Sequence, residues 1–186
     1  EMVTGVDLVR AQILIAEGCP LSDPRIDMAS QSDLRQSGYA IQCRVTTEDP
    51  ANNFAPDNGK ISAYRSGGGF GVRLDGGNAA AGSVISPYYD SLLVKVTCWD
   101  RTFEATCRKA RRAINEEHVR GVKTNIPFVT NILSHPTFIA GQCHTRFIDA
   151  TPELFDITAA KDRATRVLKY IAGIQVANPD AERRKY

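Results

Sequence analysis

A single arginine inside a glycine-dense segment is the feature of this sequence with the clearest chemical potential. Residues 67–77 read Gly-Gly-Gly-Phe-Gly-Val-Arg-Leu-Asp-Gly-Gly, and Arg73 is the cation within them. Glycines allow a backbone to approach a ligand closely, and Arg73 offers a permanent charge with a planar fork of donors. Such a fork suits a carboxylate, bicarbonate or an enolate oxygen. The alternative interpretation of the same residues is a flexible hairpin with bulges.

The glycine segment matches neither of the common nucleotide-binding motifs. Residues 67–71 lack the G-x-G-x-x-G spacing of a dinucleotide fingerprint, and they lack the Gly-Lys-Ser/Thr that opens the helix of a P-loop. The three histidines, His118, His135 and His144, are too dispersed to indicate a metal site. The five cysteines are odd in number and contain no C-x-x-C pair, which argues against a disulfide framework or a zinc site. We therefore expect no metal site within this chain.

Composition limits the class of protein. The chain has 186 residues, enough for one compact domain with a core, or a domain plus a tail. Its 42% apolar and 24% charged residues are ordinary for a soluble globular protein. A net charge of +2 is too small to indicate nucleic acid or an anionic membrane as a partner, and no apolar run approaches the roughly 20 residues that span a bilayer. The cysteine pattern favours a reducing compartment, the cytoplasm or, in a eukaryote, the mitochondrial matrix.

Several periodic segments must position Arg73. Asp7 is placed to cap a helix over residues 8–16, and Thr124-Asn125 to cap one that starts at Ile126-Pro127 and ends near His135. The remaining expected elements are strands over 40–45, 60–65 and 91–99 and helices over 102–115 and 161–170. Strands with helices segregated between them predict an α+β fold around an antiparallel or mixed sheet flanked by helices.

Two further segments have ordinary structural interpretations. Tyr88 or Tyr89 is expected to be a buried aromatic residue with a tethered hydroxyl, and Asp90 to cap a turn. The basic residues over 108–112 are expected to form a solvated helix face. On pattern alone, the sequence supports an intracellular α+β module with one notable arginine.

Five short blocks of the sequence support a more specific interpretation. They are residues 1–9 (EMVTGVDLV), 43–50 (CRVTTEDP), 69–73 (GFGVR), 88–92 (YYDSL) and 121–125 (GVKTN). Together these ordered blocks resemble the biotin carboxylase family, in which similar blocks follow one another in the same order. The first resembles the segment that follows the ATP-grasp core, and the second has the form typical of pyruvate carboxylases. Residues 146–155 and the helix after them resemble pyruvate carboxylases specifically. The resemblance implies a biotin carboxylase C-terminal subdomain over 1–149, and a connecting helix and linker over 150–186.

The family resemblance also implies a reaction. Bicarbonate and MgATP give carboxyphosphate, whose carbon dioxide is taken up by biotin, and a separate domain then carboxylates pyruvate to oxaloacetate, which serves gluconeogenesis and anaplerosis. By this resemblance, Arg73 lies beside the ureido group of biotin and stabilises its enolate-like form, and Gly69 and Gly71 line the cofactor. A guanidinium aimed at a developing oxyanion agrees with the interpretation from residue type alone.

Other partners and limits are implied by the same resemblance. The ATP- and Mg²⁺-binding groups are expected in the remainder of the same polypeptide, so the chain alone is expected to be inactive. A start at Glu1-Met2 likewise suggests a piece of a longer protein. The full enzyme is expected to form biotin carboxylase dimers within a tetramer and to bind acetyl-CoA as effector through Arg146, Arg183 and Arg184. An alternative is that Arg146 pairs with Asp149 or Glu153.

Two other functions stay open at this point. One is a module that organises dimer contacts and an effector site without catalysis of its own. The other is a subunit of an acetyl-CoA carboxylase, which the segment after residue 150 disfavours. Replacement of Arg73 separates the catalytic interpretation from the assembly module, because only the former requires this guanidinium.

Overall fold

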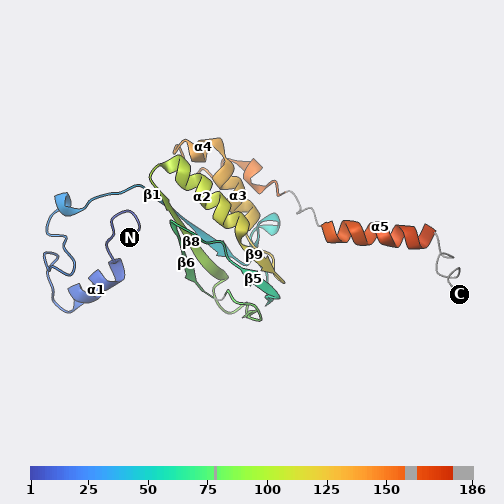
Figure 1. Cartoon of the computed structure of the whole chain (residues 1–186), viewed down its shortest axis with the longest axis horizontal. Coiled ribbons are helices and arrows are strands. Elements are labelled where there is room, and N and C mark those ends of the chain that lie inside the picture. Colours follow the sequence, from blue (N-terminus) through green and yellow to red (C-terminus); the bar gives the residue numbers. More distant parts are fainter. Residues whose placement is uncertain (78, 158–162, 178–186) are drawn as a thin grey trace.

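The computed structural model describes residues 1–77, 79–157 and 163–177. Its centre is a three-stranded antiparallel sheet in the order β1-β8-β6 (Figure 1). The strands are β1 (Tyr39–Thr46), β8 (Leu92–Asp100) and β6 (Val72–Gly76). The α+β fold with an antiparallel sheet flanked by helices is therefore confirmed.

Helices cover one face of this sheet (Figure 1). α2 (Phe103–Glu116) packs on β8 and β1, and α3 (Ile126–Ser134) packs beside α2, followed by the short α4 (Pro136–Ile139). The core between α2 and the sheet consists mainly of small and branched apolar side chains. Its fully buried members include Val45, Val94, Val96, Cys98, Ala110, Ala113 and Ile114. Thr102 caps α2 by accepting a hydrogen bond from the Ala105 amide, so this helix begins where a capping residue predicts.

Short strand pairs and 3-10 helices complete the body. The pairs are β2 (Glu48–Asp49) with β3 (Ala55–Pro56), β4 (Gly59–Lys60) with β7 (Val84–Ile85), and β5 (Ala63–Arg65) with β9 (His118–Arg120). The 3-10 helices are η1 (Gln31–Asp33), η2 (Pro50–Asn52) and η3 (Pro152–Phe155). The prediction of one continuous strand over 60–65 is wrong. The chain changes partner strand around the fully buried Ile61, so that stretch is divided between β4 and β5.

The N-terminal segment has a small core of its own. α1 (Leu8–Ala16) begins as predicted, with the Asp7 carboxylate accepting a hydrogen bond from the Arg10 amide at 2.9 Å. Ala11, Leu14 and Ile26 are buried together. The Trp99 indole N–H of β8 donates to the Ser37 carbonyl at 2.7 Å, so the segment is anchored to the sheet where it enters β1.

A last helix, α5 (Arg163–Ala177), follows residues 158–162. The helical pattern expected over 161–170 is confirmed from Arg163 onward, whereas Lys161 lies outside the described residues. α5 exposes large apolar side chains, namely Val167, Leu168, Tyr170, Ile171 and Ile174.

Asn125 connects α3 to the sheet in a way that the sequence did not indicate. It occupies the expected N-cap position, but its side chain makes no cap hydrogen bond. Instead its Oδ1 accepts from the Thr46 amide, and its Nδ2 donates to the Arg44 carbonyl, both at 3.0 Å. Since β1 is at an edge of the three-stranded sheet, the Asn125 amide takes the place of a neighbouring strand for these two backbone groups.

Replacing Asn125 with alanine should therefore destabilise the chain. Asn125 is only 8% exposed, so Asn125→Ala removes two hydrogen bonds and leaves a donor and an acceptor of β1 without partners. We expect the free energy of unfolding to fall by about 2–4 kcal/mol in urea titrations. The exposed Asn115, whose carbonyl accepts from Thr130, is the matched control, and Asn115→Ala should change stability by less than about 0.5 kcal/mol. Equal losses in both variants would contradict this role for Asn125.

Candidate functional site

The face of the sheet turned away from α2 is polar. Cys43, Val45, Val96 and Cys98 point into the core under α2, so the residues that alternate with them face the other way. Residues directly opposite one another in antiparallel strands share a face. Two rows of such residues cross all three strands: Gln42–Thr97–Arg73 and Arg44–Lys95–Asp75. The register of β8 with its two neighbours thus brings Arg73 to a polar surface.

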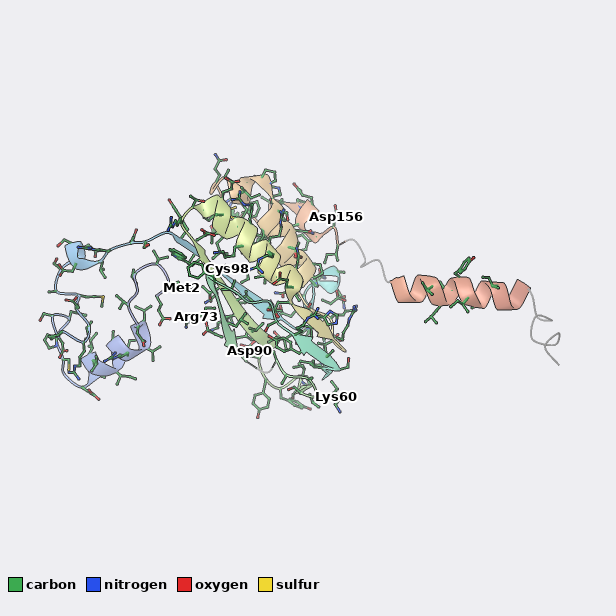
Figure 2. The ribbon with its side chains drawn as sticks, viewed as in Figure 1. Met2, Lys60, Arg73, Asp90, Cys98 and Asp156 are labelled. Atoms are coloured by element: carbon green, nitrogen blue, oxygen red, sulfur yellow. The ribbon has the colours of Figure 1, made fainter. Side chains whose placement is uncertain are left out.

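Arg73 lies on the short strand β6, which the sequence did not indicate, and its side chain is 46% exposed. Its Nε donates to Asp75 Oδ1 at 3.0 Å, and its Nη1 donates to the Glu1 carboxylate. Hydrogen bonding to Arg73 lowers the pKa of Glu1, and the two carboxylates raise the pKa of Arg73. In Figure 2 Arg73 and Met2 lie close together, where the N-terminal segment meets the sheet. The pair is therefore charged on both sides at neutral pH.

Two adjoining hollows meet at this ion pair. One, of about 310 Å³, includes Glu1 and Arg73 together with Gln42 and Thr97 from the polar face. The other, of about 490 Å³, again includes Glu1 and Arg73 and continues along residues 5–9. A larger cavity of about 680 Å³ lies within the N-terminal segment and includes neither of these two residues. We place the candidate site at the smaller hollows, because they contain both a cation and a carboxylate in contact.

Glu1 is a residue of the candidate site that the sequence alone did not indicate. It stands 72 positions before Arg73, and no spacing rule connects residues so far apart. Its position in the first ordered block (residues 1–9) is the only local signal that the sequence offers for it. The tertiary structure makes Glu1 part of the site.

The glycine loop before Arg73 (residues 66–71) joins β5 to β6. The alternative interpretation of a hairpin is wrong, because β5 pairs with β9 and β6 with β8; the glycines of this loop are explained partly by packing. Gly69 and Gly71 have φ values of +116° and +75°, which side chains rarely tolerate. A Cβ on Gly71 would lie 2.6 Å from the Trp99 carbonyl oxygen and 2.7 Å from Lys109 Nζ. Contact with β8 and α2 thus explains Gly71 within this chain. That Gly69 and Gly71 line a cofactor stays a prediction.

The basic face of α2 was expected to be merely solvated, and this is wrong for two of its members. Lys109 Nζ donates to the Trp99 carbonyl at 2.8 Å, pairs with Asp100 at 2.9 Å and lies 5.6 Å from the centre of the Phe70 ring. Arg112 donates to the Gly68 carbonyl at 3.3 Å. Through these contacts the two cations hold the glycine loop that leads into Arg73.

A buried carboxylate holds the start of the same loop. Glu117 is 7% exposed, and its Oε1 accepts from the Gly67 amide at 3.3 Å. Its Oε2 is buried without a hydrogen-bond partner among the described residues. Burial raises the pKa of Glu117, although the Gly67 amide and the Tyr64 hydroxyl oppose that rise. Ionised Glu117 is consequently a cost to the folded state.

Removing this charge should stabilise the chain at neutral pH. A carboxyl group with a raised pKa binds more protons in the folded state, so its ionisation reduces stability as the pH rises through and above its ordinary value. Glu117→Gln keeps an acceptor for the Gly67 amide without the charge. We expect a higher free energy of unfolding for the variant at pH 7 and a smaller difference near pH 4, measured by urea unfolding. The exposed Glu104→Gln is the control, and a gain for Glu117→Gln that is the same at both pH values would contradict the assignment.

Several residues of the ordered blocks meet at one corner of the fold. Glu48 accepts hydrogen bonds from the Thr46 hydroxyl at 3.0 Å and from the Ser91 hydroxyl at 2.8 Å. Asp49 pairs with Lys123, which belongs to the block that also contains Asn125. These contacts join β1, β8 and the start of α3, so this corner is structural.

The two tyrosines of the 88–92 block contradict the prediction made for them. Tyr88 is 89% exposed and Tyr89 is 79% exposed, because the turn before β8 carries them away from the core. Asp90 does cap the turn, since its carboxylate accepts from the Leu92 amide at 3.2 Å. It also lies 3.7 Å from Arg44 of the polar face.

The residues expected at an effector site are only partly described. Arg146 is exposed, and its amide donates to His144 Nδ1 at 3.2 Å. Within the described residues Arg146 forms no ion pair with Asp149 or Glu153, and Glu153 lies 3.5 Å from His135 instead. Arg183 and Arg184 lie outside the described residues. The effector assignment stays a prediction.

Two absences apply to the described residues alone. No cluster of three or more His, Cys, Asp or Glu side chains in them is arranged to hold a metal ion. None of their helices combines the length and the apolar character that crossing a bilayer requires.

Comparison with known proteins gives consistent results. Residues 42–150 match the family model described as the biotin carboxylase C-terminal domain. The chain is 56% identical over 176 residues to a pyruvate carboxylase of Bacillus subtilis, and 57% identical over 176 residues to one of Schizosaccharomyces pombe. Each alignment covers 95% of this chain and 15% of the relative, so the chain spans about a seventh of their length.

Solved structures agree with these sequence relationships. The pyruvate carboxylase of Rhizobium etli superposes with a TM-score of 0.86 at 49% identity, covering 95% of this chain and 16% of that one. The same enzyme has been solved with its allosteric activator, acetyl coenzyme A. A biotin carboxylase subunit of pyruvate carboxylase superposes with a TM-score of 0.77 at 40% identity, covering 85% of this chain and 34% of the other.

Proposed function

The chain belongs to the biotin carboxylase C-terminal domain family, and on that premise we propose that it forms one wall of the biotin-carboxylating site of a longer enzyme of the pyruvate carboxylase type. The observation that carries this proposal is the Arg73–Glu1 pair at the hollow on the polar face of the sheet. High identity to pyruvate carboxylases over nearly the whole chain supports the parent enzyme. Its overall reaction is the ATP- and bicarbonate-dependent carboxylation of pyruvate.

The polar groups at the hollow fit a planar ureido group. Arg73 offers N–H donors to a carbonyl oxygen, and Gln42 and Thr97 offer an amide and a hydroxyl in the same cross-strand row. Biotin, when bound, supplies the ureido nitrogen that accepts carbon dioxide. The Arg73 guanidinium would stabilise negative charge on the ureido oxygen, because β6 already holds this cation at the polar face.

Glu1 is suited to accept a proton at this site. Its carboxylate is ionised at neutral pH, and hydrogen bonding to Arg73 lowers its pKa further. A substrate oxyanion bound to Arg73 would offset part of the positive charge beside Glu1, so the carboxylate would become more basic. We propose that Glu1 then takes a proton from bicarbonate or from the ureido nitrogen, within hydrogen-bond reach of the group that Arg73 binds.

The rest of the reaction requires the rest of the polypeptide. A related biotin carboxylase domain was solved as a dimer with MgADP and bicarbonate, and we propose that ATP and Mg²⁺ are bound here by parts of the longer protein. The chain alone should then fail to carboxylate biotin, because the nucleotide and the metal have no ligands within it. We also propose that the full enzyme is a homo-oligomer.

Replacing Arg73 tests the catalytic proposal against a module that only assembles subunits. In the full-length enzyme, Arg73→Lys keeps the charge but loses the planar fork. We expect kcat for carboxylation of free biotin to fall about 100-fold, measured by incorporation of labelled bicarbonate. Arg111→Lys, an exposed arginine of α2, is the control and should leave the rate unchanged. Normal biotin carboxylation by Arg73→Lys would favour the assembly module.

Replacing Arg146 tests the effector proposal separately. We propose that Arg146, with Arg183 and Arg184, binds the phosphates of acetyl-CoA, because guanidinium groups grip phosphate oxygens in pairs. In the full-length enzyme, Arg146→Ala should raise the acetyl-CoA concentration for half-maximal activation about tenfold, the loss of one charge-assisted contact, with basal turnover unchanged. Arg111→Ala is again the control. An unaltered activation curve at equal stability would remove Arg146 from the effector site.

A further inference from the structure

Asp75 is placed to determine how Arg73 presents its donors. It follows Arg73 by two positions on β6, so the two side chains stand on the same face of the sheet. Asp75 Oδ1 accepts the Nε hydrogen of Arg73 at 3.0 Å. Both side chains are partly exposed, at 46% and 37%, and an ion pair of this kind contributes little to stability. Its main effect is on orientation.

Asp75 and Glu1 bind different nitrogens of the Arg73 guanidinium. A guanidinium has five N–H groups in a fixed plane. Asp75 takes the one on Nε and Glu1 takes one on Nη1. Among the described residues, Nη2 has no hydrogen-bond partner. Because the guanidinium is planar, fixing the direction of the Nε–H bond also determines where the two N–H groups of Nη2 point.

The charge of Asp75 and its effect on the orientation of Arg73 have opposite consequences for binding an oxyanion. A carboxylate beside Arg73 partly cancels the positive field that an incoming oxyanion requires. If Asp75 acted through its charge alone, it would weaken the site. A directional effect, the fixed position of the Nη2 edge, is the one that benefits a reacting oxyanion.

We infer that Asp75 is a positioning residue for Arg73, which anchors Nε and so directs the Nη2 edge of the guanidinium to the ureido oxygen of the substrate. The inference rests on the proposed function of Arg73 and deepens it. It assigns a role to a residue of β6 that follows the glycine loop (residues 66–71). It also predicts that an acceptor atom at Asp75 matters more than a negative charge there.

Two replacements of Asp75 in the full-length enzyme separate these effects. Asp75→Asn keeps an oxygen that accepts from Nε, whereas Asp75→Ala removes both the charge and the acceptor. We expect Asp75→Ala to lower kcat for carboxylation of free biotin about tenfold, with the KM for ATP and the biotin-independent, bicarbonate-dependent cleavage of ATP unchanged. Asp75→Asn should retain at least half of the normal kcat.

Controls distinguish the possible failures. Glu104→Ala removes another exposed carboxylate that pairs with an arginine, and it should have no effect. In Arg73→Ala the further change Asp75→Ala should add nothing, since Asp75 acts only through Arg73. Equal losses in the alanine and asparagine variants, a parallel loss of ATP cleavage, or normal carboxylation by Asp75→Ala would each overturn the positioning role. If Arg73→Ala is itself fully active, the proposed function fails first.

Discussion

The two-faced character of β8 is the constraint on which the rest of the structure depends. Val94, Val96 and Cys98 are fully buried beneath α2, and dehydration of this apolar surface holds the helix to the sheet. Because side chains alternate along a strand, the same burial turns Lys95 and Thr97 to the opposite face. The registers with β1 and β6 then bring Arg73 opposite Thr97. Packing on one face of the sheet therefore determines which polar side chains meet on the other face.

The layer above the core also stabilises the path of the chain into Arg73. Lys109, Arg112 and Glu117 come from α2 and its C-terminal end, and each makes a contact with the glycine loop or with the strand end beside it. The loop is therefore held by two cations and by one buried carboxylate at its start. Glycine is required where this contact is closest, at Gly71. α2 thus contributes apolar side chains to the core and polar side chains that hold the loop before Arg73.

In three dimensions the ordered blocks divide into two groups, one at the candidate site and one that joins strands and helices. Glu1 and Arg73 come from two of them and meet at the hollow on the polar face. Glu48 and Asn125 come from two others and tie β1 to the turn before β8 and to α3. A resemblance in sequence does not separate residues of the candidate site from structural residues, because the contacts of both kinds restrict which side chains fit at those positions.

Local signals in the sequence determined the α+β class, the cap at Asp7 and the apolar run of β8, and they indicated Arg73 as the candidate residue for chemistry. These depend on neighbouring residues, and the physics of capping and side-chain alternation acts over a few positions. The tertiary structure alone decided that Glu1 contacts Arg73 and that Asn125 serves an edge strand, contacts across 72 and 79 positions. It also decided the division of residues 60–65 and the exposure of Tyr88, since strand pairing and burial depend on which distant segments come together.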